Sequence, residues 1–217
     1  MTSATQASAQ IDGLIDHLRD ELKKNPGSVI AHHRLALSLW KAQHFEEAID
    51  MFTKALEIDP TSFEIRINLG SLYFQLGRFE EGLQENKKAI EVYPRSAEAL
   101  TNIGSAYIQL KKWPEAAEYL KKAIGVKPTM VPAWTNLTTV LIEMGEYEEA
   151  KEAGEQAVKL APSFPLAHNN LAAALYYTEN YEKALVHLEK AKDLGYPVHP
   201  DFMDQVQEKA SQATHGG

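Results

Sequence analysis

Residues 63–96 read FEIRINLGSLYFQLGRFEEGLQENKKAIEVYPRS, and residues 97–130 repeat the pattern as AEALTNIGSAYIQLKKWPEAAEYLKKAIGVKPTM. The interval of 34 residues that relates the two stretches recurs through most of the chain. It is clearest in a row of prolines, which are Pro26, Pro60, Pro94, Pro128 and Pro162. Proline lacks a backbone N–H and disfavours helix in the residue before it, so each proline marks the end of a helical segment. A fixed period of this length indicates a stacked repeat protein.

Each repeat is predicted to contain two helices. In the first repeat Leu35, Ala36 and Leu39 form one apolar helical face, and a loop near Gln43 and His44 precedes the second helix. An aromatic residue begins every second helix, at Phe45, Phe79, Trp113, Tyr147 and Tyr181. The five repeats are predicted to occupy residues 29–62, 63–96, 97–130, 131–164 and 165–198.

Small residues recur where two helices must cross closely. In the first helices they follow a large apolar residue, as Leu35-Ala36, Leu69-Gly70, Ile103-Gly104 and Leu171-Ala172. In the second helices they are Ala48, Ala116, Ala150 and Ala184. With these residues the chain resembles the tetratricopeptide repeat (TPR) family. The resemblance implies an all-α fold, a right-handed α-solenoid of TPR helix-turn-helix repeats whose first helices line a concave groove.

Both ends of the array are predicted to carry a covering helix. Residues 1–28 would form an N-terminal tail and a capping half-repeat helix, because apolar residues recur there at helical spacing: Ile11, Leu14, Ile15, Leu18 and Leu22. Residues 199–212 would form a C-terminal capping helix, and residues 213–217 a disordered tail. An alternative interpretation makes the N-terminal helix a detachable arm that binds a partner.

Four residues depart from the repeat pattern. Thr138 stands where the other repeats have alanine or glycine. Gly82 replaces an alanine, which we expect to be harmless to packing but to cost about 1 kcal/mol in helix propensity. Asn86 and Gly154 stand in a row that otherwise holds large apolar residues. We expect Arg66 to make a polar contact with Asn86, and Trp134 to fill the space opposite Gly154.

Composition argues against several classes of function. The formal net charge of −8 disfavours nucleic acid as a partner, because phosphate binding relies on a basic surface. The chain has no cysteine, and its eight histidines show no metal-ligand spacing with carboxylates. Nucleotide-binding and nucleophile-elbow motifs are absent from the sequence, so we expect no enzyme activity and no cofactor. With no long apolar run and no signal-peptide pattern, a cytoplasmic protein without a membrane span is predicted.

The most informative feature for function is a row of asparagines at intervals of 34 residues: Asn68, Asn102, Asn136 and Asn170. An asparagine amide offers both donors and an acceptor, which match the N–H and C=O groups of an extended peptide. The row is similar to the asparagine ladder of the TPR superhelix of O-GlcNAc transferase. The alternative is that these amides make local hydrogen bonds within the array.

Neighbouring rows complete the predicted peptide-binding surface. They add a charged residue, several hydroxyl and amide groups, and two aromatic anchors: Arg34, Thr101, Ser105, Thr135, Thr139, Gln109, Tyr176 and Tyr177. TPR proteins that bind the C-terminal carboxylate of chaperones use a clamp of Lys, Asn, Asn, Lys and Arg. The matching positions here are His33, Leu37, Asn68, Glu98 and Asn102, of which Asn68 alone agrees, so chaperone tails are not expected as ligands.

The predicted function is that of a protein–protein interaction adaptor or scaffold. It would bind an extended or helical peptide segment of a partner in the concave TPR groove. The alternative is a self-assembling scaffold, in which a terminal helix or an array end docks on a neighbouring copy. The partner's identity and the use of the concave or the convex face stay open.

Overall fold

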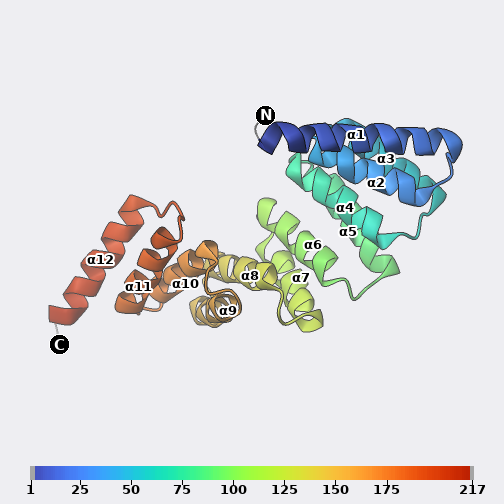
Figure 1. The fold of residues 1–217 in the computed structure, drawn as a ribbon. Coiled ribbons are helices and arrows are strands. Elements are labelled where there is room, and N and C mark those ends of the chain that lie inside the picture. The colour runs from blue at the N-terminus through green and yellow to red at the C-terminus, as the bar shows by residue number, and fades with distance from the viewer. Residues whose placement is uncertain (1–2, 216–217) are drawn as a thin grey trace. The chain divides into compact units, whose positions relative to one another are not determined.

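The structure, a computed structural model, describes residues 3–215, and side chains are described for residues 9–212. Within residues 3–215 all regular secondary structure is α-helical, and no strand occurs (Figure 1). The first helices of the repeats are α2 (Val29–Lys41), α4 (Phe63–Gln75), α6 (Ala97–Gln109), α8 (Val131–Glu143) and α10 (Pro165–Tyr177). The second helices are α3 (Phe45–Ile58), α5 (Phe79–Val92), α7 (Trp113–Val126), α9 (Tyr147–Leu160) and α11 (Tyr181–Asp193). The chain begins with α1 (Ser3–Lys24) and ends with α12 (Pro200–His215).

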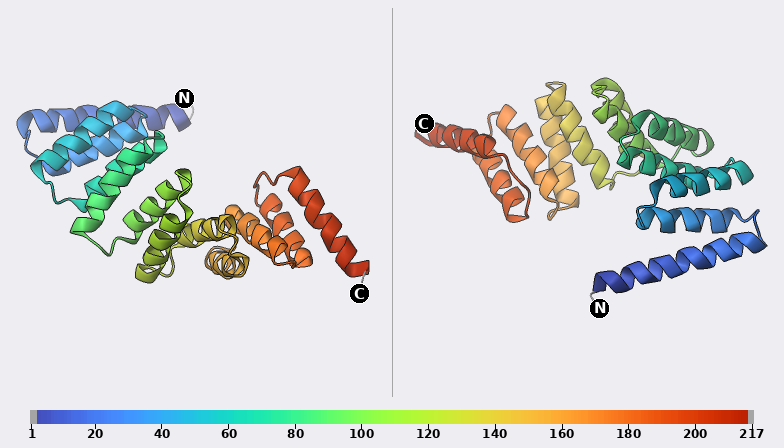
Figure 2. Two further views of the ribbon diagram at one scale, coloured as in Figure 1. Left: turned by 180° about the vertical axis from the view of Figure 1, so that it is seen from behind. Right: turned by 90° about the horizontal axis from the view of Figure 1, so that it is seen from above.

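The chain divides into two compact units, an N-terminal unit of residues 1–102 and a C-terminal unit of residues 103–217. The division falls within α6. In the N-terminal unit, helices α1 to α5 pack in chain order, each against the next. In the C-terminal unit the same holds for α7 to α12, as both views of each unit show (Figure 2). This is the arrangement of an all-α TPR solenoid.

The turn between the two helices of a repeat has the same backbone conformation throughout. Five residues at intervals of 34 have positive φ angles, which are Gln43 (64°), Gly77 (73°), Lys111 (54°), Gly145 (78°) and Glu179 (59°). Such a left-handed residue ends a helix by reversing the chain. In the first repeat the following N–H group, of His44, then bonds to the carbonyl of Leu39 at 2.9 Å. The tight turn places the second helix antiparallel against the first.

The N-terminal cap is a longer helix than the sequence predicted. Helix α1 begins at Ser3, whereas the apolar spacing indicated a helix from about Ile11. Ile15 and Leu18 are buried against the core of the first repeat, where Phe52 and Leu39 are also fully enclosed. The first part of α1, residues 3–10, contains no apolar residue larger than alanine, which is why the pattern did not mark it.

The C-terminal cap also extends beyond its predicted end. Residues 213–215, which the sequence assigned to a disordered tail, continue α12, and residues 216–217 lie outside the described residues. Val206 of α12 is fully buried and packs with Phe202 and Met203 against Leu171 and Leu188. Helix α12 therefore covers the apolar face of the last repeat.

Removing residues 199–217 should lower solubility or produce new oligomers. The deletion would expose Leu175 and Leu188, which are 2% and 0% exposed, as one apolar patch. Size-exclusion chromatography with light scattering over a concentration series measures the result. Removing residues 213–217 alone is the control and should change nothing. A soluble monomer with an unchanged melting temperature after the longer deletion would contradict a capping role for α12.

Across residues 3–215, no helix combines the length and the apolar character that crossing a bilayer requires.

Candidate functional site

The asparagine row of the N-terminal unit is held by hydrogen bonds between neighbouring repeats. The Asn68 side-chain N–H donates to Nε2 of His33 on α2, at 2.9 Å. The Asn102 amide donates to Ser71 Oγ on α4 at 3.1 Å and to Asn86 Oδ1 on α5 at 3.2 Å. Asn86 itself is fully buried and donates to the Gly82 carbonyl at 2.9 Å. These amides therefore join successive helices of the unit.

The C-terminal unit repeats the arrangement with hydroxyl partners. The Asn136 amide donates to Ser105 Oγ at 2.8 Å. The Asn170 amide donates to Thr139 Oγ1 at 2.9 Å and to the Thr135 carbonyl at 3.2 Å. The alternative interpretation, that the asparagines bond locally within the array, thus describes their N–H groups in both units.

The residue 31 positions before each asparagine determines which group accepts a hydrogen bond from its amide. For the last three asparagines this residue carries a hydroxyl, at Ser71, Ser105 and Thr139. For Asn68 the equivalent residue is Leu37, which has no polar group, so the amide contacts His33 instead. Both the asparagine row and the hydroxyl row can be read from the sequence. Their constant separation of 31 residues was the signal that could have related them.

The amide oxygens of the row remain available. Among the side chains of residues 9–212, Arg66 Nε is the single buried polar atom without a hydrogen bond. The oxygens of Asn68, Asn102 and Asn136 form no hydrogen bond within this part of the chain, so they must reach solvent. Asn170 is 9% exposed, and its oxygen accepts a long bond of 3.5 Å from Asn169. The row therefore presents acceptors, held in place through their own N–H groups.

This corrects the expectation that each asparagine offers a donor pair as well as an acceptor. An amide has two N–H hydrogens. At Asn102 and at Asn170 both are used inside the array, so neither residue can donate to a ligand without losing a bond that joins two helices.

Two predicted contact residues do not line the surface. Thr101 and Thr135 are 6% and 2% exposed. Their hydroxyls donate to the backbone carbonyls of Ala97 and Val131 in their own helices, at 2.7 and 3.0 Å. Each threonine directly precedes an asparagine of the row, so its side chain points about 100° away from that asparagine around the helix and is buried.

The other predicted residues are accessible to different degrees. Arg34 and Gln109 are exposed, and Ser105 and Thr139 are half-buried as acceptors for the asparagines. Tyr177 is 49% exposed and stacks on the Tyr147 ring, with 4.5 Å between centroids. Tyr176, in contrast, is enclosed by rings, because it makes edge contacts with three aromatic side chains: Tyr177, Tyr181 and Phe202. Tyr177 is thus the more accessible ring of the pair.

Tyr177 borders a hollow of about 360 Å³ in the C-terminal unit. Ile142 of α8 and Asn169 and Ala173 of α10 form one side of it. The chain after α11 forms the other side, with Tyr196, Pro197, His199 and Phe202. The sequence analysis missed these four as site residues, because they lie beyond the last position that the 34-residue period relates. The loss of register at Pro197 was the available signal.

Two half-buried histidines have lowered pKa values. Burial lowers the pKa of His33, and the Glu64 carboxylate opposes this in part. Burial, and next the charge of His168, lower the pKa of His187. His33 Nε2 receives the Asn68 N–H, so this imidazole must be unprotonated at that nitrogen to keep the bond. Protonation of His33 would therefore break the contact between α2 and α4.

Stability should fall as the pH decreases from about 7.5 to about 5.5, across the ordinary histidine pKa of about 6.5. The pKa values of His33 and His187 are lower in the folded chain than in the unfolded chain, so the unfolded chain binds more protons in this range. The stability that the two neutral histidines contribute is fully present above their pKa in the unfolded chain. It is lost as the pH falls through their pKa values in the folded chain. Urea unfolding at several pH values measures the slope. A double variant, His33→Gln with His187→Gln, should have a flatter slope, and an unchanged slope would contradict the assignment.

Among the residues that the structure describes, no group of three or more His, Asp or Glu side chains is placed to hold a metal ion.

Comparison with known proteins gives consistent matches. A family model described as Tetratricopeptide repeat matches residues 39–101 and 107–169, and a second with the same description matches residues 168–195. The peroxisomal targeting signal receptor of Candida albicans is 35% identical over 71 residues, which is 33% of this chain and only 12% of that protein.

The crystal structure of MamA is similar with a TM-score of 0.67 and 26% identity, over 74% of this chain and 94% of MamA. YrrB, described as a TPR protein with an unusual peptide-binding site, has a TM-score of 0.69 over 90% of this chain and 97% of its own. Its identity of 22% shows the fold alone.

Proposed function

Because the chain belongs to the tetratricopeptide repeat family, whose members are protein-interaction scaffolds, we propose that it is an adaptor for a peptide segment of a partner protein. The segment binds in extended or helical form along the first helices of either unit, where the asparagines of that unit lie. The observation that carries the proposal is the set of amide oxygens of Asn68, Asn102 and Asn136. They are solvent-accessible, without a partner within residues 9–212, and fixed by the N–H group of the same amide.

Fixed acceptors are suited to bind backbone N–H groups. Every residue of an extended peptide except proline carries one N–H group, so the row can hold a peptide backbone whatever its side chains are. Because each amide is already oriented, little rotamer entropy is lost when the ligand binds. The asparagine row accordingly supplies affinity and orientation, as the ladder of O-GlcNAc transferase suggested by resemblance.

Selectivity for a side chain comes from the hollow beside Tyr177. Its walls are apolar and aromatic, with Ile142, Tyr196 and Phe202, and it lies next to the Asn169 amide. A hollow of about 360 Å³ is large enough for one aromatic or branched side chain of the ligand. The ligand of the C-terminal unit is therefore a peptide with one large apolar anchor. YrrB, which has the same fold, is described as having a peptide-binding site.

Selection from random peptides displayed on phage tests the function. Peptides enriched on the wild-type chain should lose at least about tenfold in affinity, or 1.4 kcal/mol, on an Ala173→Arg variant. Ala173 is half-buried at the hollow, so the arginine would fill the space that the anchor needs. The matched control is Ala153→Met on α9, which does not border this hollow and should bind normally.

The competing function would give a different result. If the chain assembles with itself, light scattering should show oligomers that depend on concentration, and Ala173→Arg or removal of α1 should dissolve them. Enriched peptides that bind Ala173→Arg as tightly as the wild type would overturn the proposed function.

A further inference from the structure

A second, larger hollow lies in the C-terminal unit, between α7, α8 and α9. Its volume is about 700 Å³. Its apolar lining is formed by Ile124, Trp134, Leu137, Leu141 and Ala153. None of the residues of the asparagine row borders it. The hollow is therefore a separate surface from the one to which peptide binding is assigned above.

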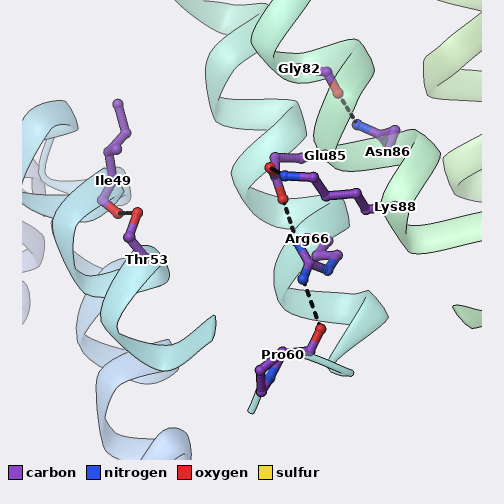
Figure 3. A network of polar contacts seen from close by, with 8 residues as sticks. All are labelled: Ile49, Thr53, Pro60, Arg66, Gly82, Glu85, Asn86 and Lys88. Atoms are coloured by element: carbon purple, nitrogen blue, oxygen red, sulfur yellow. Dashed lines mark hydrogen bonds and ion pairs between the residues drawn. The ribbon is translucent and has the colours of Figure 1, made fainter. Parts of the chain in front are cut away.

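The hollow is large because one position of the fourth repeat holds a small residue. In several repeats a residue of the first helix lies near the residue 19 positions later in the second helix. In the second repeat this pair is Arg66 and Glu85, an ion pair of 2.7 Å with both side chains largely buried (Figure 3). In the fifth repeat it is His168 and His187, whose Nδ1 atoms are 2.9 Å apart.

The fourth repeat has Trp134 and Ala153 at these positions. Its second-helix residue is the smallest of the row, whose other members are Met51, Glu85, Tyr119 and His187. The Trp134 indole does not fill the space beside Ala153, because its N–H donates to the Pro128 carbonyl at 2.7 Å and holds the ring in place.

The anchored indole belongs to a periodic feature. Arg66 and His168, at the equivalent positions of their repeats, bond in the same way to the carbonyls of Pro60 and Pro162, at 2.8 and 2.9 Å. Trp134 is thus held as a wall of the hollow, and the space in front of Ala153 stays open.

The rim of this hollow is acidic. Glu149 is paired with Lys121 of α7 at 3.2 Å. Glu152 and Glu155 are exposed and form no ion pair with any residue of the described part of the chain. Lys151, next to Glu152 in the chain, interacts with both carboxylates only at longer range. Two negative charges thus lie beside apolar surface without an ion-pair partner, which favours a ligand that brings positive charge.

The equivalent place in the N-terminal unit has the opposite character. The hollow there is smaller, about 390 Å³, and Met51 stands where Ala153 stands in the fourth repeat. Its rim carries Arg19, Lys23 and Lys54. The acidic rim is therefore a property of the fourth repeat and does not follow from the repeat pattern.

We propose that the hollow between α7, α8 and α9 binds a basic amphipathic helix of a partner protein. Apolar side chains from successive turns of that helix enter the hollow, and its lysines or arginines contact Glu152 and Glu155. The volume exceeds what one side chain needs and falls in the range of established ligand sites, about 300–1,000 Å³. A second copy of this chain is a poor match, because its net charge is −8 and its second helices begin with acidic residues.

The probe is a synthetic amphipathic peptide with leucines on one helical face and lysines beside them. A second peptide with glutamate for each lysine is its counterpart. Binding is followed by calorimetry and by the fluorescence of Trp134 in a Trp40→Phe/Trp113→Phe chain, where it is the remaining tryptophan. The lysine peptide should bind and shift the Trp134 emission, and the glutamate peptide should not.

Two kinds of variant test the site itself. Ala153→Tyr places the residue of the third repeat in the hollow and should weaken binding by at least tenfold. Ala153→Met carries the same test with the residue of the first repeat, should the tyrosine variant fail to fold. The double variant Glu152→Lys/Glu155→Lys should lower the affinity for the lysine peptide by a similar factor and allow the glutamate peptide to bind. Glu57→Lys/Glu91→Lys, on α3 and α5, makes the same change in net charge and should have no effect.

Three results would overturn the proposal. The lysine peptide could bind the wild type and both Ala153 variants equally, which would place it elsewhere. The two peptides could bind equally, which would remove the role of the acidic rim. The chain could self-associate in a way that Ala153→Met abolishes, which would make a second copy the occupant. Peptides selected for the asparagine row should bind every one of these variants normally, so a failure here is distinct from a failure of the proposed function.

Discussion

Replacing Gly82 with alanine should lower the free energy of unfolding of the N-terminal unit by about 1–3 kcal/mol, as overpacking of a close contact does. An added Cβ would lie 2.3 Å from the Phe74 ring and 2.8 Å from the Gly70 carbonyl oxygen. The carbonyl belongs to the backbone of α4, so it can move aside only if α4 and α5 separate. Helix propensity alone predicts a gain of about 1 kcal/mol for the same change, so the sign of the effect distinguishes the two causes.

Gly125→Ala is the matched control. Gly125 also lies inside a second helix, α7, but an added Cβ would meet no atom within 4 Å. This change should stabilise the chain by about 0.5–1 kcal/mol, which is the ordinary benefit of alanine over glycine in a helix. Urea unfolding, followed by Trp40 fluorescence for the N-terminal unit, measures the first effect. A Gly82→Ala chain as stable as the wild type would show that α4 and α5 can separate at little cost.

The fold was predictable because one interval relates the residues that build it. Helix ends, the left-handed turn residues and the small residues at the crossings all recur every 34 positions. Both terminal helices lie outside the five repeats, and for them only apolar spacing was available. That spacing located Ile15, Leu18 and Val206 in the core but gave no information on how far α1 and α12 extend.

For Arg66 and Trp134 the sequence predicted the right type of contact but the wrong contacted residue. Arg66 does make a polar contact, with Glu85 and not with Asn86 (Figure 3). Trp134 does stand opposite a small residue, Ala153, and borders the hollow with it. In both cases the true partner precedes the predicted one by one residue, which turns the side chain by about 100° around a helix. Sequence rows give the repeat position of a residue but not this rotation.

Gly154 is explained by its other neighbours. An added Cβ would lie 3.1 Å from Leu171 of α10, so the glycine lets α9 approach the next repeat. The residue opposite it in the same repeat is Thr138, in the relation that Gly70 has to Asn86 and Gly104 to Leu120. The other repeats pair a small residue in the first helix with a larger residue in the second helix. In the fourth repeat the sizes are exchanged, because Thr138 is the larger residue and Gly154 the smaller one.

The site was predicted in part for the same reason. The period located the asparagines, but their hydrogen bonds run between helices of different repeats, and the rotation of each helix decides which groups meet. For this reason Thr101 and Thr135 were placed on the surface although they are buried. The hollow beside Tyr177 depends on the chain after Pro197, where no repeat relates one residue to another.

Replacing both Asn102 and Asn136, one in each unit, with alanine should weaken the binding of a peptide selected on the wild type by about twofold to tenfold. Each acceptor bond contributes about 0.5–1.5 kcal/mol, and each unit loses one oxygen. The same change should also destabilise the fold. Asn86 Oδ1 would lose its donor, and this side chain is fully buried, so the cost is about 1–3 kcal/mol.

The matched control separates these two effects. Ser71→Ala/Ser105→Ala removes the hydroxyls that accept from Asn102 and Asn136 but leaves both amide oxygens in place. It should therefore lower stability modestly and change affinity by less than the asparagine pair does. Calorimetry and urea unfolding on both double variants give the four quantities needed. If the serine pair and the asparagine pair lower affinity equally, the oxygens do not hold the ligand, and the asparagines serve only to join the repeats.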